Sequence, residues 1–339
     1  MKLTTGIHKF FDWYLPRIKG VSENTIKSYR DTFKLFLPFA AKFFSLNYHC
    51  IMIDQLTIDL IISFLEYLER ERNNIPQTRN SRLATFKSFA RMILLIYPEH
   101  RKVGERLLHL PKKRSQKPLI GFLTHEEISE VFKKVDLKTK EGFRDYTILH
   151  LLYDSGARAS EIASLRIDNF DPLRKTITLL GKGNRYRLIE LWPITVELLN
   201  RYLANYRVTP YALSRYHLFI NQRGTAFTRH GIYRLCKKYL TRALLPKRMK
   251  ELNPAHSFRH TCAVHMLLNG SPITDIKNRL GHAEIQSTMV YLNLSLSRKK
   301  EIQKKFMEYT QSTLKHDAKI TEFLDWENKE ETLVWLDSL

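Results

Sequence analysis

The spacing of hydrophobic side chains predicts helices through the first 110 residues. A helix beginning after Ser22 has apolar residues three and four positions apart. It is expected to end near Pro38, because proline lacks a backbone donor. A second helix follows Thr57, and a third runs from about Thr78 to Ile96. Together these elements indicate a helical N-terminal domain.

Basic residues accompany this pattern in two places. Cations alternate with apolar positions along the third helix, so that one face can be buried while the other meets phosphate or only solvent. The segment from Leu110 to Pro118 has two prolines, four cations and no apolar period, which indicates an extended linker. The candidate DNA contacts are Arg79, Arg82, Lys87, Lys112, Lys113 and Arg114.

The hydrophobic period changes from helix to strand in the second half of the chain. Residues Thr176–Leu180 and Arg185–Ile189 flank a Gly-Lys-Gly-Asn turn, which predicts a β-hairpin with Lys182 at its tip. A third short strand is expected at His217–Asn221, and helices resume from Ile232 to Leu240. The predicted fold class is therefore mainly α with a small antiparallel β-sheet.

The length of 339 residues suits two domains. We expect a helical domain over residues 1–110, a basic linker over 111–120, a second domain over 121–310 and an acidic extension over 311–339.

The charge of the chain indicates which class of partner it binds. Lys and Arg outnumber Asp and Glu by 56 to 34, for a net charge of +22, although residues 316–339 are acidic. A basic body attracts polyanions, so nucleic acid is the leading partner, and an unspecialised basic surface is the alternative. With no long apolar segment and three scattered cysteines, we expect a cytoplasmic, nucleoid-associated protein with reduced thiols.

Seven polar residues in separate segments supply the groups that phosphoryl transfer from a diester needs. Such a reaction uses a hydroxyl nucleophile, fixed guanidinium groups and proton carriers, and it needs no metal. Taken singly, each residue has an ordinary structural explanation. The neighbouring His260, His265 and Cys262 lack metal-ligand spacing and are expected to be structural. The seven candidates are Arg158, Glu161, Lys182, His256, Arg259, His282 and Tyr291.

The order and spacing of these candidates resemble the signature of tyrosine recombinases, closest to the Xer and integrase branch. The matching segments are Ser155-Gly-Ala-Arg158-Ala-Ser-Glu161-Ile, His256-Ser-Phe-Arg259-His260, Leu280-Gly-His282 and the tyrosine nine residues later. The hairpin lysine also matches. The resemblance covers residues 1–310 and implies a SAM-like core-binding domain and a mixed α/β catalytic domain that clamp the duplex.

The resemblance also implies roles for the candidates. Tyr291 would form a 3′-phosphotyrosine while Arg158 and Arg259 stabilise the pentavalent phosphate. Lys182 would protonate the departing 5′ oxygen, and His256 would accept the tyrosine proton.

In the same family pattern, His282 would donate to a phosphate oxygen and Glu161 would position its neighbours. No cofactor or metal is implied. The partners would be duplex DNA with inverted repeats, three further copies in a tetramer that the C-terminal segment joins in trans, and accessory recombinases. The role could be that of a mobile-element integrase, a transposase or an Xer-like resolvase acting through a Holliday junction. The alternatives are a type IB topoisomerase, a DNA-binding regulator without turnover and an RNA-binding protein.

Overall fold

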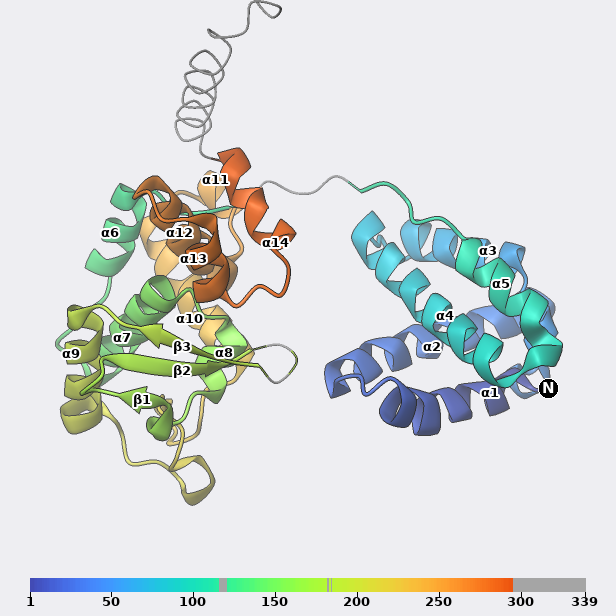
Figure 1. The fold of residues 1–339 in the computed structure, drawn as a ribbon, viewed down its shortest axis with the longest axis horizontal. Helices are drawn as coiled ribbons and strands as arrows, with labels where there is room; N and C mark the ends of the chain where they lie inside the picture. The colour runs from blue at the N-terminus through green and yellow to red at the C-terminus, as the bar shows by residue number, and fades with distance from the viewer. Residues whose placement is uncertain (116–120, 182, 184, 295–339) are drawn as a thin grey trace, which may run out of the picture. The chain divides into compact units, whose positions relative to one another are not determined.

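The computed structural model describes residues 1–115, 121–181, 183 and 185–294, and the chain divides into two compact units, Met1–Pro118 and Leu119–Leu339 (Figure 1). The predicted linker therefore lies partly, and the hairpin-tip Lys182 and the acidic extension lie wholly, outside the described residues. The N-terminal unit is helical. Its helices are α1 (Leu3–Lys9), α2 (Glu23–Phe44), α3 (Ile58–Arg70), α4 (Pro76–Ile96) and α5 (Arg101–His109), with a π-helical segment at Phe10–Ile18.

An aromatic core holds the N-terminal unit together. Phe36 of α2 contacts Phe64 of α3 and Phe86 of α4 edge-on, with ring centroids 5.2 and 4.8 Å apart. Phe10 and Phe89 join the same buried cluster. Edge-to-face pairs of this kind add to the stabilisation from burial, so the predicted helices are locked by their aromatic faces.

Pro38 does not end α2, contrary to the sequence-based expectation. The helix continues for six residues to Phe44. The ring of Phe39, directly after the proline, lies 5.4 Å from Phe64 and 5.1 Å from Tyr67 of α3. These contacts stabilise the turn beyond Pro38 and outweigh the lost backbone hydrogen bond.

The C-terminal unit combines helices with one small sheet. In chain order its main elements are α6 (His125–Lys133), α7 (Lys140–Ser155), α8 (Ala159–Ser164), β1 (Phe170–Asp171), β2 (Thr176–Leu180), β3 (Tyr186–Glu190), α9 (Pro193–Arg201), α10 (Arg229–Ala243), α11 (Pro246–Met249), α12 (Pro254–Leu268), α13 (Ile273–Leu280) and α14 (Gln286–Met289). This confirms the predicted fold class and the hairpin. The strands are antiparallel in the order β1-β2-β3.

The third strand lies elsewhere than the sequence predicted. It is β1, whereas His217–Asn221 forms only single bridges, from His217 to Arg166 and from Ile220 to Ala226. Side chains satisfy this backbone instead of a neighbouring strand. The Tyr202 hydroxyl accepts the Ile220 N–H at 3.1 Å, and the Arg207 guanidinium donates to carbonyls here. The apolar run therefore marks a buried connection.

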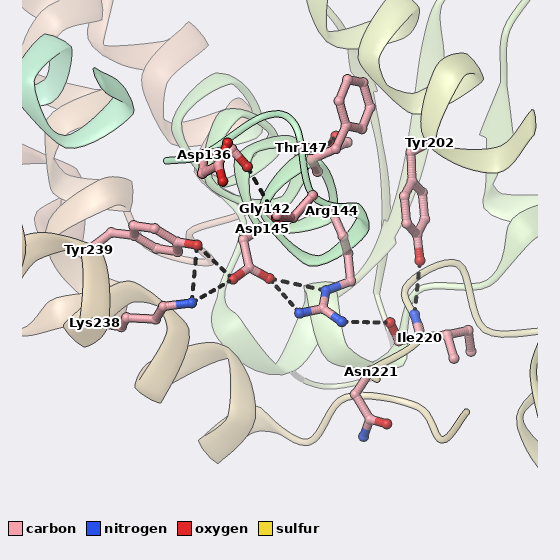
Figure 2. Close-up of polar contacts among 12 residues, drawn as sticks. Asp136, Gly142, Arg144, Asp145, Thr147, Tyr202, Ile220, Asn221, Lys238 and Tyr239 are labelled. Atoms are coloured by element: carbon pink, nitrogen blue, oxygen red, sulfur yellow. Dashed lines mark hydrogen bonds and ion pairs between the residues drawn. The ribbon is translucent and has the colours of Figure 1, made fainter. Parts of the chain in front are cut away.

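A buried carboxylate joins α7 to α10, as Figure 2 shows. Asp145 accepts two hydrogen bonds from the adjacent Arg144, at 3.0 and 2.7 Å. Its other oxygen accepts the Tyr239 hydroxyl at 2.9 Å and lies 3.4 Å from the ammonium of Lys238. Because a buried charge is costly unless it is paired, this network fixes the two helices against each other.

Candidate active site

The turn between α7 and α8 places the first candidate arginine. Gly156 ends α7 with a left-handed backbone (φ 60°), and a Cβ there would lie 2.7 Å from Leu280 Cδ2, so glycine is required. Arg158 then stands at the N-cap of α8. Its N–H and its guanidinium both donate to Glu161, at 2.8 and 2.7 Å. The side chain of Arg158 is thereby held in one orientation, partly exposed.

Glu161 is a buried carboxylate shared by two arginines. Arg187 of β3 donates to both of its oxygens, at 3.0 and 2.7 Å. Burial alone would raise the pKa of the Glu161 carboxyl, but the hydrogen bonds and charges of Arg187 and Arg158 hold that pKa below its ordinary value. Glu161 is thus an ionised anchor, which fits the positioning role expected for it.

Arg259 of α12 ties together the ends of two other helices. Its guanidinium is almost fully buried and donates to the carbonyls of Gly156 and Leu280, at 2.8 and 2.6 Å. Burial, followed by repulsion from Arg158, lowers the pKa of Arg259 to about 10. The group remains a cation at neutral pH, and its two carbonyl bonds fix its direction.

His282 lies just after the end of α13. Gly281 closes the helix in a left-handed conformation (φ 65°) and turns the chain at His282. The Nδ1 atom of His282 lies 2.8 Å from the buried Thr288 hydroxyl. Burial and the charges of Arg259, Arg158 and Arg187 lower the pKa of His282 to about 4, so its imidazole is neutral at pH 7 in this structure.

Tyr291 packs beside these groups with its ring only 2% exposed. Its hydroxyl lies 2.8 Å from Nδ1 of His260. Burial raises the pKa of Tyr291 to about 12, although the charges of Arg259 and Arg158 pull it down. His256, to which the family pattern gives the tyrosine proton, is exposed one turn earlier on α12, with its ring centroid 6.1 Å from that of His260.

An open groove of about 1000 Å³ runs beside the candidates. Arg158, Arg187 and His282 line it, together with Gly181 and Gly183 on either side of the hairpin tip. Three cationic or polar segments far apart in the sequence thus face one space. The groove suits an extended anionic ligand better than a compact apolar one.

A second layer of contacts supports the groove. Arg187 also donates to the carbonyl of Arg279 at 3.0 Å, and Arg279 in turn donates to the carbonyl of Asp154 at 2.9 Å and binds its carboxylate. The other carboxylate oxygen of Asp154 accepts the Trp192 N–H at 2.8 Å. This chain of contacts links β3, α13 and α7, the elements that carry or border the candidates.

Sequence reasoning missed three of these contributors. Arg187 had a usable signal, because it lies two residues before Ile189 and so shares the inward face of β3 with it. His260 and Arg279 had none, since their contacts join segments that are distant along the chain. His260 contacts the candidate nucleophile, whereas the sequence suggested only a structural place in its helix.

The candidate DNA contacts of the N-terminal unit fall into two groups. Some are engaged internally: Glu69 binds both Arg79 and Lys113, at 3.6 and 2.9 Å, and Arg82 donates to the Thr32 hydroxyl at 3.0 Å. Lys87 and Lys112 form the second group, in which like charges repel each other. Burial, then the charges of Lys112 and Arg91, lower the pKa of Lys87. Arg114 is exposed.

The described residues contain neither a cluster of metal ligands nor a membrane-spanning helix. Over the parts of the chain with assigned positions, no group of three His, Cys, Asp or Glu side chains could hold a metal ion. Within the same residues, no helix has the length and apolar character needed to cross a bilayer.

The sequence matches known families over most of its length. A model of the phage integrase family matches residues 121–298, and one of the phage integrase N-terminal SAM-like domain matches residues 8–94. Tyrosine recombinase XerD of Staphylococcus haemolyticus is 31% identical over 301 residues, covering 85% of this chain and 94% of that protein. The putative integrase/recombinase y4rC of Sinorhizobium fredii is 29% identical over 324 residues, covering 94% and 96%.

Solved structures show the same fold. The Tn1549 transposon integrase in complex with transposon right end DNA aligns with a TM-score of 0.65 at 16% identity, covering 88% of this chain and 98% of that one. The XerH site-specific recombinase bound to its difH substrate aligns with a TM-score of 0.62 at 21% identity, covering 82% and 78%.

Proposed function

Because this chain belongs to the phage integrase family of tyrosine recombinases, whose members cleave and rejoin DNA, we propose that it recombines duplex DNA through a 3′-phosphotyrosine formed by Tyr291. Family membership confirms the resemblance predicted from the motifs. The observation that supports the proposed chemistry is the buried Tyr291 hydroxyl, 2.8 Å from the residue next to Arg259 on α12, whose guanidinium is fixed by two backbone carbonyls.

The arrangement suits an in-line displacement at phosphorus. Arg158 and Arg259 would hold the non-bridging oxygens and stabilise charge in the transition state, since each is already oriented before DNA arrives. His282 would donate a further hydrogen bond to the phosphate, and the family pattern gives the tyrosine proton to His256. Lys182, on the hairpin that borders the groove, would protonate the departing 5′ oxygen.

The proposed substrate is duplex DNA that carries inverted repeats. The chain's excess of basic residues and the groove lined by arginines favour such a polyanion. We further propose that four copies assemble on two sites and that the segment after Tyr291 docks in trans. Removing residues 316–339 should then reduce recombination more than it reduces binding to a single site.

A suicide substrate tests the chemistry. The DNA flanking the coding region is searched for inverted repeats, and a duplex that carries them is nicked next to the expected cleavage position to trap the covalent adduct. Mass spectrometry should map the adduct to Tyr291, and Tyr291→Phe should bind DNA without forming it. Tyr211→Phe, at an exposed tyrosine, is the control. An adduct that persists in Tyr291→Phe would refute the proposal.

A further inference from the structure

The Tyr291 hydroxyl already has a hydrogen-bond partner, and it is not the histidine that the sequence motif suggested. His260 follows Arg259 on α12, and its Nδ1 atom lies 2.8 Å from the phenolic oxygen. His256 lies one helical turn away and is exposed, beside Arg259 and Arg158. The geometry separates the two histidines: one contacts the nucleophile, and the other borders the cations that would hold the phosphate.

We infer that His260 accepts the proton of Tyr291 as the phenolic oxygen attacks the scissile phosphate. The inference rests on the proposed function, because it assigns a group to that reaction. It gives His256 a place at the phosphate rather than at the tyrosine. It also gives a chemical role to His260, for which only a structural role was expected from the sequence.

The proton balance of this step is complete. The Tyr291 O–H bond breaks, its proton passes to Nδ1 of His260, and the oxygen forms a bond to phosphorus. The bond from phosphorus to the 5′ oxygen breaks, and that oxygen takes a proton from Lys182. In rejoining, a 5′-hydroxyl attacks phosphorus and gives its proton back to Lys182, the bond from phosphorus to the tyrosine oxygen breaks, and His260 returns the proton to that oxygen.

The protonation state of His260 suits a proton acceptor. Burial, then the charges of His256, Arg259 and His282, lower its pKa to about 4, so the ring is neutral at pH 7. A phenol is a stronger hydrogen-bond donor than a neutral imidazole, so Tyr291 donates and Nδ1 accepts. The proton stays on oxygen before attack because the pKa of Tyr291 is raised to about 12. It becomes acidic only as the oxygen bonds to phosphorus.

Arrival of DNA would strengthen this base. The groups that lower the pKa of His260 are cations or can become cations, and Arg259 is the permanent one among them. A phosphate anion bound by Arg259 offsets that charge and raises the pKa of His260. The part of the shift that comes from charge is therefore linked to substrate binding, whereas its largest cause, burial, is not relieved by the phosphate.

Two substitutions at His260 separate proton transfer from positioning. In His260→Asn, the amide oxygen falls close to the place of Nδ1, so it can accept the Tyr291 hydrogen bond but cannot take the proton. His260→Ala removes both. Adduct formation on the suicide substrate should fall about 100-fold or more in both variants, since general bases contribute about 10² to 10⁴. His8→Asn, at an exposed histidine of the N-terminal unit, is the matched control.

A sulfur-substituted substrate isolates the base from the acid. A 5′-bridging phosphorothiolate has a thiolate leaving group that needs no proton, so it should rescue Lys182→Ala but not His260→Asn. Thermal melting and DNA binding show that each variant is folded.

Each outcome decides one question. Near-normal cleavage by His260→Asn, with slow cleavage by His260→Ala, would show that His260 only positions Tyr291. Faster cleavage by His260→Ala would show that the hydrogen bond holds Tyr291 in an inactive position. Either result overturns the inference. If both variants cleave normally while Tyr291→Phe is inactive, the inference fails and the proposed function stands. If Tyr291→Phe forms the adduct, the proposed function itself fails.

Discussion

Arg187 of β3 holds the buried carboxylate of Glu161 through two hydrogen bonds, 3.0 and 2.7 Å long. The same carboxylate holds Arg158, the first candidate arginine of the site. Because Arg187 also donates to the backbone of Arg279, it connects the hairpin to the helix that ends at His282. The orientation of the groove therefore depends on a residue that need not contact the substrate.

Replacing Arg187 should damage cleavage more than DNA binding. Arg187→Met leaves Glu161 with one guanidinium partner and releases the hairpin from α13. Breaking a buried ion pair costs about 3–5 kcal/mol, so a lower free energy of unfolding is expected in urea titrations. Displacement of the supported groups by about 1 Å should slow adduct formation by about 100-fold. Binding of intact duplex should fall by a smaller factor, because Arg187 is one of several cations that line the groove.

Arg174→Gln provides the comparison, because this arginine lies in the same unit with its side chain 83% exposed. It should resemble the unsubstituted protein in both assays. Equal loss of DNA binding and cleavage in Arg187→Met would show that Arg187 contacts DNA directly rather than positioning Glu161.

The pH dependence of stability should report the ionisation of Glu161. Its pKa in the folded chain is depressed, so its contribution is fully present above the unfolded pKa of about 4.3 and is lost as pH falls through the folded value. Glu161→Gln should be less stable at pH 7. Below about pH 4.3, its free energy of unfolding should fall less steeply with acid than that of the unsubstituted protein. Chemical denaturation across pH measures both slopes, and parallel curves would contradict the assignment.

The fold could be predicted where local pattern and packing agree. The helix after Thr57 and the hairpin at residues 176–190 follow from apolar periodicity, and both are confirmed. The prediction that the helix after Ser22 ends near Pro38 was wrong, because aromatic contacts with α3 outweigh the helix-breaking effect of the proline. The strand at His217–Asn221 was also wrong, because burial of an apolar run does not reveal whether side chains or a strand will satisfy its backbone.

The candidate site was predictable as a set of residues, and its contacts were not. The structure gathers Arg158, Arg259, His282 and Tyr291 around the ends of α7 and α13, while their roles stay predictions. The residues that hold these candidates in place could not be predicted from the sequence, because an ion pair such as that of Arg279 with Asp154 joins positions 125 residues apart. Only Arg187 left a trace in the sequence, as a charged residue on the inward face of a strand.

The buried network of Figure 2 should contribute to stability without affecting chemistry. Tyr239 donates its hydroxyl to Asp145, and burial, then the Asp145 charge, raises the pKa of this tyrosine. Hydrogen bonds to charged groups contribute about 1.5–3 kcal/mol, so Tyr239→Phe should lower the free energy of unfolding by about that amount. Tyr211→Phe, at an exposed position, should change it by less than about 0.5 kcal/mol.

Urea titration of both variants measures the difference, and the rate of adduct formation should be the same in each. A stability of Tyr239→Phe equal to that of the unsubstituted protein would mean that Arg144 and Lys238 alone satisfy the carboxylate.

The repulsive cluster of Lys87, Arg91 and Lys112 should be a phosphate-binding surface. Burial and the two neighbouring charges lower the pKa of Lys87, so placing three cations together costs free energy in the absence of DNA. A phosphate would relieve that repulsion. Arg79 and Lys113 instead share one carboxylate, that of Glu69, which offsets part of their charge.

Removing one contact from this cluster should change the salt dependence of binding by a fixed amount. Each phosphate contact adds about 0.9 to the slope of log affinity against log salt, so Lys87→Gln should reduce that slope by about 0.9. The loss should be the same for specific and unrelated duplexes, because phosphate contacts do not read sequence. Lys27→Gln, at an exposed lysine 3.9 Å from Glu23, serves as the control. A Lys87→Gln slope equal to the control slope, measured by fluorescence anisotropy from low to moderate salt, would place the DNA on another face of this unit.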